Sequence, residues 1–276
     1  MNIIGIGDNV VDYYKQQNLF YPGGNALNVS VMGKRNGFEN AAFLGIFGND
    51  IPSNHILSCL QNEGIDISRS RHALGECGKA TISIDNGERK FLNSNKETRI
   101  SSLLKLSLQD DDIAYINNFD IIHTSINSHI DLELKKISHK NISYDFSIKN
   151  KWNNEIINNI APYITYAFFS GSDLTEKEIF DLIDFVHKYN VKVIIVTRGE
   201  KSAILSFNGS IYKQAPYPTN LVDTMGAGDS FIAGFLASFY KNGNPEEALN
   251  QAAQSASITC SHFGAIGYPK AKLSNK

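Results

Sequence analysis

The sequence predicts an α/β fold with a doubly wound, mostly parallel sheet and a small β lid. Short apolar runs of strand length alternate with segments of helical periodicity along most of the 276 residues. Such alternation is typical of βαβ units whose sheet is covered on both faces. A hydrophobic fraction of 42% is enough for one large core. We therefore expect a single domain spanning residues 1–276, because α/β domains of this length are often undivided.

The expected strands of the main sheet are short apolar runs, and the expected helices lie between them. The first strand is predicted at residues 3–7, and the first helix follows after an interruption. Further strands are predicted at residues 41–47, 120–124, 143–146, 163–169 and 192–197. The helices are predicted at about residues 25–35, 53–63, 131–138, 153–160, 175–189, 227–241 and 245–261.

Two regions interrupt this alternation. The runs 81–85 and 89–92 flank Asn86-Gly87, a residue pair that favours a tight hairpin turn. The segment 10–22 separates the first strand from the first helix. We expect residues 10–22 and 78–95 to form a β lid inserted in the domain. A second hairpin is predicted at residues 203–207 and 210–214.

The composition excludes several classes of protein. Because 26 basic residues offset 28 acidic ones, the formal net charge is -2 and the pI is about 6.4, without the basic excess of a nucleic-acid-binding protein. No apolar run is long enough to span a bilayer, and the N-terminus resembles no signal peptide. The three cysteines have no metal-type spacing. We expect a cytoplasmic protein that binds neither membrane nor nucleic acid.

The segment 222–231 carries the strongest chemical signal. Gly226 and Gly228 precede an apolar segment of helical periodicity, which indicates a turn that opens a helix and lets backbone N–H groups approach a ligand. These groups lie at the positive end of the helix dipole and form an anion site. Asp229 follows in the first turn, where a carboxylate can accept a proton from a hydroxyl. Alternatively, Asp229 only caps the helix and the glycines only form the turn.

The longer string Asp223-Thr224-Met225-Gly226-Ala227-Gly228-Asp229 favours the catalytic interpretation. It resembles the second signature of the PfkB (ribokinase-like) carbohydrate kinases, and the resemblance runs over nearly the whole chain. It implies an ATP-dependent kinase that phosphorylates a primary hydroxyl of a sugar-type molecule. Asp229 is then the base, and the N–H groups of Gly226, Ala227 and Gly228 stabilise charge on the transferred phosphoryl group.

A first signature lies near the N-terminus. Pro22-Gly23-Gly24-Asn25-Ala26-Leu27-Asn28 resembles the Gly-Gly…Asn element through which these kinases hold the sugar. Gly7-Asp8-Asn9-Val10-Val11-Asp12 resembles their first strand with its substrate-binding aspartate. The resemblance implies that Asp12, Asn28 and the backbone at Gly23 and Gly24 bind the substrate. Taken alone, the two glycines form a plain turn and Asp12 is a surface carboxylate.

The nucleotide side matches the family less completely. Thr197 and Gly199 resemble the family's Thr-x-Gly turn, where the phosphates of ATP pass. The family usually has Asn-x-x-Glu one strand earlier, whereas this sequence has Ser170 and Asp173 at the corresponding positions. The resemblance implies that these four residues and Gly228 bind the nucleotide. Mg²⁺ is then held largely by phosphates and water, with Asp173 as a candidate ligand.

Two further expectations come from the resemblance. Similar kinases hold a monovalent cation near the second signature, so Asp223, with backbone carbonyls near Met225, His262 and Gly264, is a candidate site for K⁺. Similar kinases also often dimerise through their lids, so we expect a homodimer formed in this way.

Within the family, the strings are most similar to those of kinases that phosphorylate fructoselysine, which implies fructoselysine 6-phosphate as the product. The lysine half of that substrate carries a carboxylate, and Arg89 in the lid hairpin is the candidate that binds it. Lys79 and Lys90 are competitors, and Arg89 as a solvated arginine is the alternative. Two other functions remain open: a kinase for a nucleoside or simple hexose, and a non-catalytic sugar-binding regulator on the same scaffold.

Two other features invite functional interpretation. His123 and His129 do not form a helical metal-binding face, and we interpret His123 as a structural histidine. The run 110–112 consists of aspartates, and we interpret it as the acidic first turn of a helix rather than as a metal site.

Overall fold

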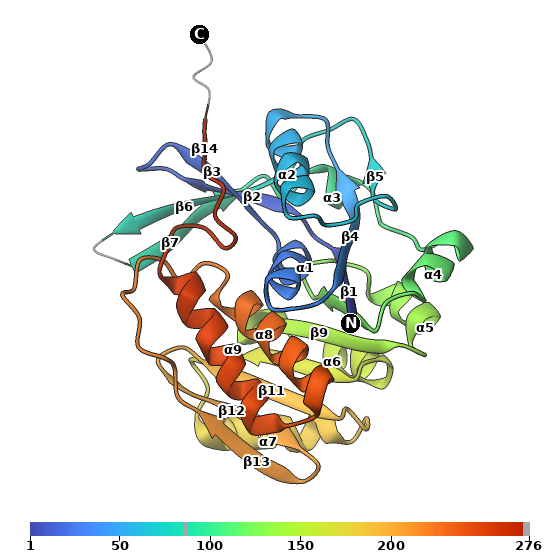
Figure 1. Ribbon diagram of the computed structural model, residues 1–276, viewed down its shortest axis with the longest axis vertical. Helices are drawn as coiled ribbons and strands as arrows, with labels where there is room; N and C mark the ends of the chain where they lie inside the picture. The colour runs from blue at the N-terminus through green and yellow to red at the C-terminus, as the bar shows by residue number, and fades with distance from the viewer. Residues whose placement is uncertain (86–87, 273–276) are drawn as a thin grey trace.

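The computed structural model describes residues 1–85 and 88–272, and a long, strongly twisted sheet runs through it (Figure 1). In the order of the sheet, every neighbouring pair of strands from Arg71–His72 to Val193–Arg198 is parallel, whereas the two pairs that add Lys201–Phe207 and Ser210–Gln214 are antiparallel. The predicted doubly wound, mostly parallel sheet is therefore confirmed. In spatial order its strands are β13 (Ser210–Gln214), β12 (Lys201–Phe207), β11 (Val193–Arg198), β10 (Tyr166–Ser170), β9 (Asn141–Ile148), β8 (Ile121–Ser125), β1 (Asn2–Gly7), β4 (Asn40–Phe47) and β5 (Arg71–His72).

Helices cover both faces of the sheet and form two apolar cores. One core contains residues of α1 (Asn25–Arg35), α2 (Ile51–Asn62), α8 (Ala227–Asn242) and α9 (Pro245–Cys260). The other contains residues of α4 (Asp110–Ile116), α5 (Leu134–Ile137), α6 (Asn154–Ile160) and α7 (Glu176–His187). Among the helices of the described ranges, none has both the length and the apolar character needed to cross a bilayer.

Strand β1 shows why the apolar runs become central strands. Ile3 points into one core, while Ile4 and Ile6 point into the other, and all three side chains are fully buried. A strand buried on both faces needs consecutive apolar residues rather than alternation with polar ones. The short predicted runs were therefore placed correctly, although most observed elements differ from the prediction by a few residues at their ends.

A second, smaller sheet lies beside the main one, at the upper left of Figure 1. In spatial order its strands are β14 (Lys270–Ala271), β3 (Leu19–Gly23), β2 (Val10–Tyr14), β6 (Gly78–Asp85) and β7 (Glu88–Ser94). The sequence predicted that residues 10–22 and 78–95 form β structure, and these segments contain β2, β3, β6 and β7. It did not predict β14, which is too short to give a periodic signal. The predicted turn Asn86-Gly87 lies outside the described residues.

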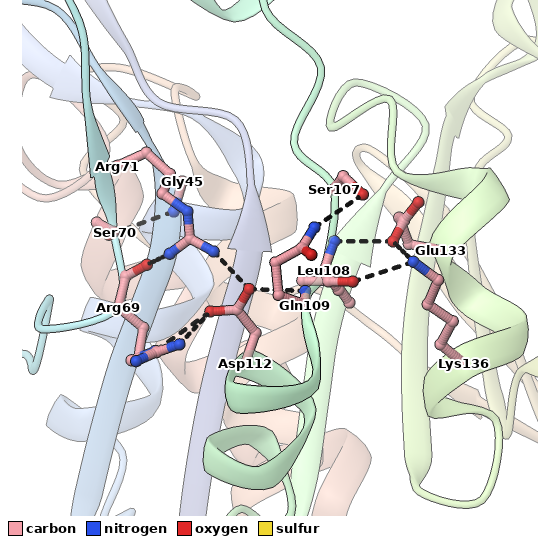
Figure 2. Close-up of polar contacts among 10 residues, drawn as sticks. All are labelled: Gly45, Arg69, Ser70, Arg71, Ser107, Leu108, Gln109, Asp112, Glu133 and Lys136. Carbon is pink, nitrogen blue, oxygen red and sulfur yellow. Dashed lines mark hydrogen bonds and ion pairs between the residues drawn. The ribbon is translucent and has the colours of Figure 1, made fainter.

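The acidic run 110–112 begins helix α4, as interpreted, but Asp112 is not an exposed decoration of its first turn. The carboxylate of Asp112 is fully buried and forms ion pairs with Arg69 at 3.0 Å and with Arg71. Figure 2 shows both arginines pointing at this one carboxylate, which also accepts a 2.9 Å hydrogen bond from the backbone N–H of Gln109. Although burial raises the pKa of Asp112, the hydrogen bonds from Gln109, Arg71 and Arg69 outweigh burial and hold the pKa below its usual value. The cluster therefore connects β5 and the residues just before it to the start of α4.

A short helix, α3 (Ile100–Leu103), follows β7, and its Ile100 packs into the core that also contains residues of α4, α5, α6 and α7. Single turns of 3₁₀ helix complete the secondary structure at residues Asp131–Glu133, Lys149–Lys151 and Ala161–Tyr163.

Candidate active site

The turn before α8 has the geometry that its glycines predict. Gly226 has a φ of +75°, and a Cβ at this position would lie 2.4 Å from the Cβ of Ala265, so only glycine fits. A Cβ at Gly228 would meet no atom within 4 Å, so open space adjoins the start of the helix. The N–H of Ala227 donates to the carbonyl of Thr224 at 3.3 Å within the turn. The next N–H groups of α8 lie at the positive end of its dipole.

Asp229 lies in the first turn of α8, partly buried, and two asparagines of α1 hold its carboxylate. Asn25 Nδ2 donates to Oδ1 at 2.7 Å, and Asn28 Nδ2 donates to Oδ2 at 2.6 Å. The pKa of Asp229 is raised to about 7, chiefly by burial; the charges of Asp145 and Asp8 contribute to the rise, and the hydrogen bonds from the two asparagines oppose it. A carboxyl group with this pKa can accept a proton near neutral pH.

Asn25 connects Asp229 to two more polar residues. Its Nδ2 also donates to Asp145 Oδ2 at 2.8 Å, so one amide group bridges two carboxylates. Its Oδ1 lies 2.8 Å from Nε2 of His123, whose Nδ1 lies 2.9 Å from Ser143 Oγ. His123 is fully buried, and burial lowers its pKa to about 3, so it is neutral.

The carboxylate of Asp145 lies near the carboxyl end of β9 and is partly buried. It accepts a 2.8 Å hydrogen bond from the N–H of Ser147 in addition to the one from Asn25. Burial raises its pKa to about 6, and the charge of Asp8 adds to the shift. Three carboxylates, those of Asp8, Asp145 and Asp229, therefore influence one another around Asn25.

Asp8 follows β1 and caps α1 from outside the helix. Its carboxylate accepts from the N–H of Asn25 at 2.9 Å, from the N–H of Ala26 at 3.2 Å and from the hydroxyl of Ser128 at 3.0 Å. The residue that precedes α1 is Gly24, which has no side chain to provide a cap. A carboxylate at this helix N-terminus is favoured by the unpaired N–H groups and by the dipole.

The amide of Asn28 has one free end. The side chain is 3% exposed, and its Oδ1 is a buried acceptor without a hydrogen-bond partner among the described residues. Because Nδ2 donates to Asp229, the orphaned oxygen lies on the same amide, close to that carboxylate. A buried acceptor without a partner is costly unless a ligand supplies the donor.

Asp12, Gly23 and Gly24 lie close to the start of α1. Asp12 is buried on β2, and a Cβ at Gly23 on β3 would lie 2.4 Å from its Oδ2. Gly24 has a φ of +110°, and a Cβ there would lie 2.6 Å from the carbonyl oxygen of Asp8. The Gly-Gly pair therefore allows Asp12 and the end of β1 to approach the first turn of α1, where Asn25 and Asn28 lie.

The residues predicted on the nucleotide side lie at the carboxyl ends of neighbouring strands. Ser170 ends β10 and pairs with Thr197 on β11, and Gly199 has a φ of +62° in the turn that follows. The N–H of Gly171 donates to the carbonyl of Thr197 at 2.8 Å. Asp173 is exposed between β10 and α7. Within residues 1–85 and 88–272, no group of three or more His, Cys, Asp or Glu side chains is arranged so that it could hold a metal ion.

Asp223 is buried and fixes the loop that leads into α8. Its carboxylate accepts from the N–H groups of Met225 and Gly264, each at 3.0 Å, and from the hydroxyl of Tyr14 on β2. The side chain of Asp223 thus connects three segments: the turn before α8, the loop after α9 and the second sheet. Its two oxygens are already engaged by protein donors.

Arg89 lies in β7, where its backbone pairs with Ile84 of β6. Its side chain lies outside the described part of the structure, so its predicted contact with a substrate carboxylate stays a prediction.

Sequence reasoning did not identify Asn25, Asp8 and Asp145 as site residues. Asn25 stands in the Gly-Gly motif, Asp8 in the first-strand motif and Asp145 in the strand predicted at residues 143–146. The signal that was missed is the position of Asp8 and Asp145 at the carboxyl ends of two strands, where polar residues of a parallel sheet converge. His123 was interpreted as structural, and the structure adds its contact with Asn25.

The chain is similar to known proteins over nearly its whole length. The model of the "pfkB family carbohydrate kinase" matches residues 2–271. Fructosamine kinase FrlD of Bacillus subtilis (strain 168) is 44% identical over 97% of this chain and 94% of its own length. Fructoselysine 6-kinase of Escherichia coli (strain K12) is 30% identical over 94% of this chain and 97% of its own length. Among solved structures, the fructokinase with bound ATP from Xylella fastidiosa superposes with a TM-score of 0.78 at 15% identity, covering 96% of this chain and 94% of its own.

Proposed function

Because the chain belongs to the pfkB family of carbohydrate kinases, we propose that it transfers the γ-phosphoryl group of ATP to the primary hydroxyl at C6 of a fructosamine. Fructoselysine is the proposed substrate, and fructoselysine 6-phosphate and ADP are the products. Support comes from the names of the two relatives, a fructosamine kinase and a fructoselysine 6-kinase, which both align over nearly the whole chain.

One observation carries the proposed chemistry: the carboxylate of Asp229 is held by Asn25 and Asn28 beside the N-terminus of α8. Asp229 accepts the proton of the C6 hydroxyl while that oxygen forms its bond to the γ-phosphorus. The bond from the γ-phosphorus to the bridging oxygen breaks, and ADP leaves with that electron pair. The backbone of Gly226, Ala227 and Gly228 supplies the positive dipole end that faces the transferred group. Positioning and electrostatics account for most of such acceleration.

The sugar is proposed to lie between α1 and the second sheet. Asn28 offers the buried Oδ1 that has no partner among the described side chains, and this atom is suited to accept a hydrogen bond from a sugar hydroxyl. Asp12 offers a second acceptor, and the backbone of Gly23 and Gly24, against which Asp12 and the end of β1 pack, is proposed to contact the sugar as well. Directional acceptors of this kind bind a polyol in one orientation.

ATP is proposed to lie along the carboxyl ends of β10 and β11. Ser170, Thr197, Gly199 and Asp173 contact its phosphates or the associated Mg²⁺, and the open space beside Gly228 accommodates the terminal phosphate. Since the described residues hold no cluster of three metal ligands, Mg²⁺ is bound mainly through phosphate and water oxygens, with Asp173 as the nearby carboxylate.

A monovalent cation such as K⁺ is a further proposal for the loop fixed by Asp223. The carboxylate already accepts hydrogen bonds from Met225, Gly264 and Tyr14, so a cation here adds to a loop that the protein itself stabilises. Dialysis against a large organic cation followed by titration with K⁺ tests it, and activity independent of K⁺ excludes the site.

The second sheet is proposed to act as a lid over the sugar within a single domain. Closure excludes water and so limits ATP hydrolysis. Its outer strand β7 exposes Phe91 and Leu92, at 65% and 46% of their surface, and these apolar side chains support the proposal of a homodimer formed through the lid. Sedimentation of the wild type and of a Phe91→Asp variant measures whether this face holds two copies together.

The decisive experiment for the function is a substrate panel. Purified enzyme with Mg²⁺ and ATP is offered fructoselysine, other ketose-amines, fructose and other hexoses, and nucleosides, and each product is identified by mass spectrometry and by ³¹P resonance. The highest kcat/KM on fructoselysine supports the proposal. A preference for a hexose or nucleoside overturns the substrate, and sugar binding without any turnover points instead to a non-catalytic regulator.

A further inference from the structure

The buried imidazole of His123 faces the asparagine that holds the base. His123 lies on β8, where its register partner on β1 is Gly5. A Cβ at Gly5 would lie 2.1 Å from the carbonyl oxygen of Ala26, so the absence of a side chain lets α1 lie directly against the sheet. This close approach brings Asn25 within 2.8 Å of His123 Nε2.

The hydrogen-bond pattern determines which atom of each partner faces the other. The amide of Asn25 can donate two protons, and both are directed at carboxylates, those of Asp145 and Asp229. The atom that faces His123 is therefore the carbonyl Oδ1, which only accepts. A neutral imidazole has one N–H, so it must lie on Nε2, and Nδ1 accepts from the hydroxyl of Ser143.

The opposite arrangement is unfavourable. If the proton lay on Nδ1, the imidazole would present a bare Nε2 to Asn25, and the amide would have to turn by half a rotation about its terminal torsion. Its carbonyl oxygen would then face the two carboxylates, and Asp229 would lose one of its two donors. The donor on Nε2 therefore selects between two orientations of Asn25 that are otherwise similar in shape.

We propose that His123 is a positioning residue, whose Nε2–H fixes the amide of Asn25 in the orientation that donates to both Asp229 and Asp145 and so holds Asp229 ready to accept the substrate's proton. This inference rests on the proposed role of Asp229 as the base. His123 acts only through Asn25, and its own proton is not transferred.

The groups that face Asp229 determine how its pKa changes when the contact between His123 and Asn25 is lost. Asp8 from the end of β1 and Asp145 from β9 raise its pKa by their charge, while Asn25 and Asn28 from α1 lower it. His123 on β8 is neutral, and the N-terminal dipole of α8 favours the charged carboxylate. When Asn25 is no longer held, one lowering contact is lost while both carboxylates remain, so Asp229 must bind its proton more tightly.

A matched pair of variants tests the inference. In His123→Gln the side-chain amide reaches the position of Nε2 and can donate to Asn25. In His123→Asn the shorter amide reaches only the position of Nδ1 and leaves Asn25 Oδ1 without a donor. The readout is the pH dependence of kcat/KM on the best substrate of the panel.

The expected result is that His123→Asn moves the acidic limb of the profile to higher pH by about one unit, which corresponds to about 1.4 kcal/mol. His123→Gln keeps the limb of the wild type. A loss of kcat/KM in His123→Asn with an unmoved limb would reduce His123 to a structural role. Equal shifts in both variants would show that the donor on Nε2 is not the determinant.

A measurement on the wild type keeps the inference testable if a variant fails to fold. Nitrogen-15 resonances of labelled histidine should report a neutral imidazole protonated on Nε2 throughout the stable pH range. A proton on Nδ1 overturns the inference. This readout needs no substrate, so it is separate from the proposed function, which instead fails if Asp229→Asn retains activity.

Discussion

Asn28 contacts Asp229 through Nδ2 at 2.6 Å, while the other end of the same amide, Oδ1, is buried and has no partner among the described residues. A single side chain thus stabilises the carboxylate and leaves an acceptor beside it. A hydroxyl that donates to this acceptor is brought close to the proposed base. The geometry therefore favours a substrate in which one hydroxyl donates to Asn28 while a neighbouring hydroxyl faces the proposed base.

Replacing Asp229 by Asn removes the proposed base with almost no change in shape. We expect kcat to fall by about two to four orders of magnitude, the usual range for general acid–base catalysis. Binding of ATP, measured by calorimetry, should persist because the backbone of α8 is unchanged. Turnover near that of the wild type would remove Asp229 as the base.

The same variant has an expected effect on stability. Burial raises the pKa of Asp229 from 3.8 to about 7, so ionising this group disfavours the folded state as pH rises between these values. Asp229→Asn abolishes that penalty. Its melting temperature should therefore exceed that of the wild type at mildly alkaline pH, and the difference should vanish at acidic pH.

The pH dependence of activity follows from the same group. Because the base must be ionised to accept a proton, kcat/KM should rise with pH through an apparent pKa near 7 and then level off. The charges of Asp145 and Asp8 contribute to this raised pKa of Asp229. A profile without an acidic limb above pH 5 would contradict the environment described for Asp229.

The two glycines of the anion site should respond differently to alanine. Gly228→Ala places a methyl group in open space, so we expect a folded protein whose KM for ATP rises at least about tenfold, since the methyl group obstructs the approach to the helix N-terminus. Gly226→Ala forces a φ of +75° on alanine and contacts Ala265, so it should lower the free energy of unfolding by more than about 1–2 kcal/mol. Steady-state kinetics and urea unfolding of both variants separate these effects.

Arg89→Ala tests the contact with the lysine half of the substrate. We expect kcat/KM to fall about tenfold or more on fructoselysine, equivalent to about 1.4 kcal/mol, and to stay unchanged on fructose, which lacks the carboxylate. Lys79→Ala, on the neighbouring strand β6, tests the competing candidate, and a selective loss in that variant instead would assign the contact to Lys79. Equal losses on both sugars, or none, would show that Arg89 does not bind the tail.

The pair of arginines around Asp112 leads to a prediction on stability. Asp112→Asn keeps the shape but removes the charge that Arg69 and Arg71 share, and we expect the free energy of unfolding to fall by about 1–3 kcal/mol, because the arginines are partly exposed. Asp111→Asn, an exposed neighbour on the same helix, should have almost no effect. Since the pKa of Asp112 is lowered on folding, its contribution is present above the unfolded-state pKa and is lost as pH falls through the folded-state pKa. Urea unfolding of both variants at neutral and acidic pH measures each part.

Much of the fold could be predicted because its signals are local. The strands of the main sheet are apolar runs buried on both faces. Helix α7 is capped by Thr175, whose hydroxyl accepts from the N–H of Glu178 in a capping box that is visible in the sequence. Strand β14 has only two residues and pairs with a segment from the start of the chain. No local pattern indicates such a partner.

The site could be predicted only where a motif is continuous in sequence. Gly226, Gly228 and Asp229 form one string, whereas the contact of Asn25 with Asp229 joins residues 204 positions apart. The contact of Asn25 with His123 spans 98 positions. His123 stands within an apolar run. A histidine that only packs in the core and a histidine that positions a site residue have the same sequence context there. Only the register of β8 against β1 and the close approach of α1 distinguish them.

The distance along the chain between Asn28 and Asp229, 201 positions, has a consequence for synthesis on the ribosome. The segment with Asp8, Asn25 and Asn28 emerges first, and it has no base until α8 has been made. Likewise, Tyr14 cannot form its hydrogen bond with Asp223 until that residue, 209 positions later, has been made. A nascent or truncated chain that ends before α8 therefore contains the proposed sugar-binding residues without the proposed base, and we expect it to be unable to phosphorylate the sugar. Closing such distant contacts is also slow because loop entropy must be overcome first, so we expect activity to appear late during folding.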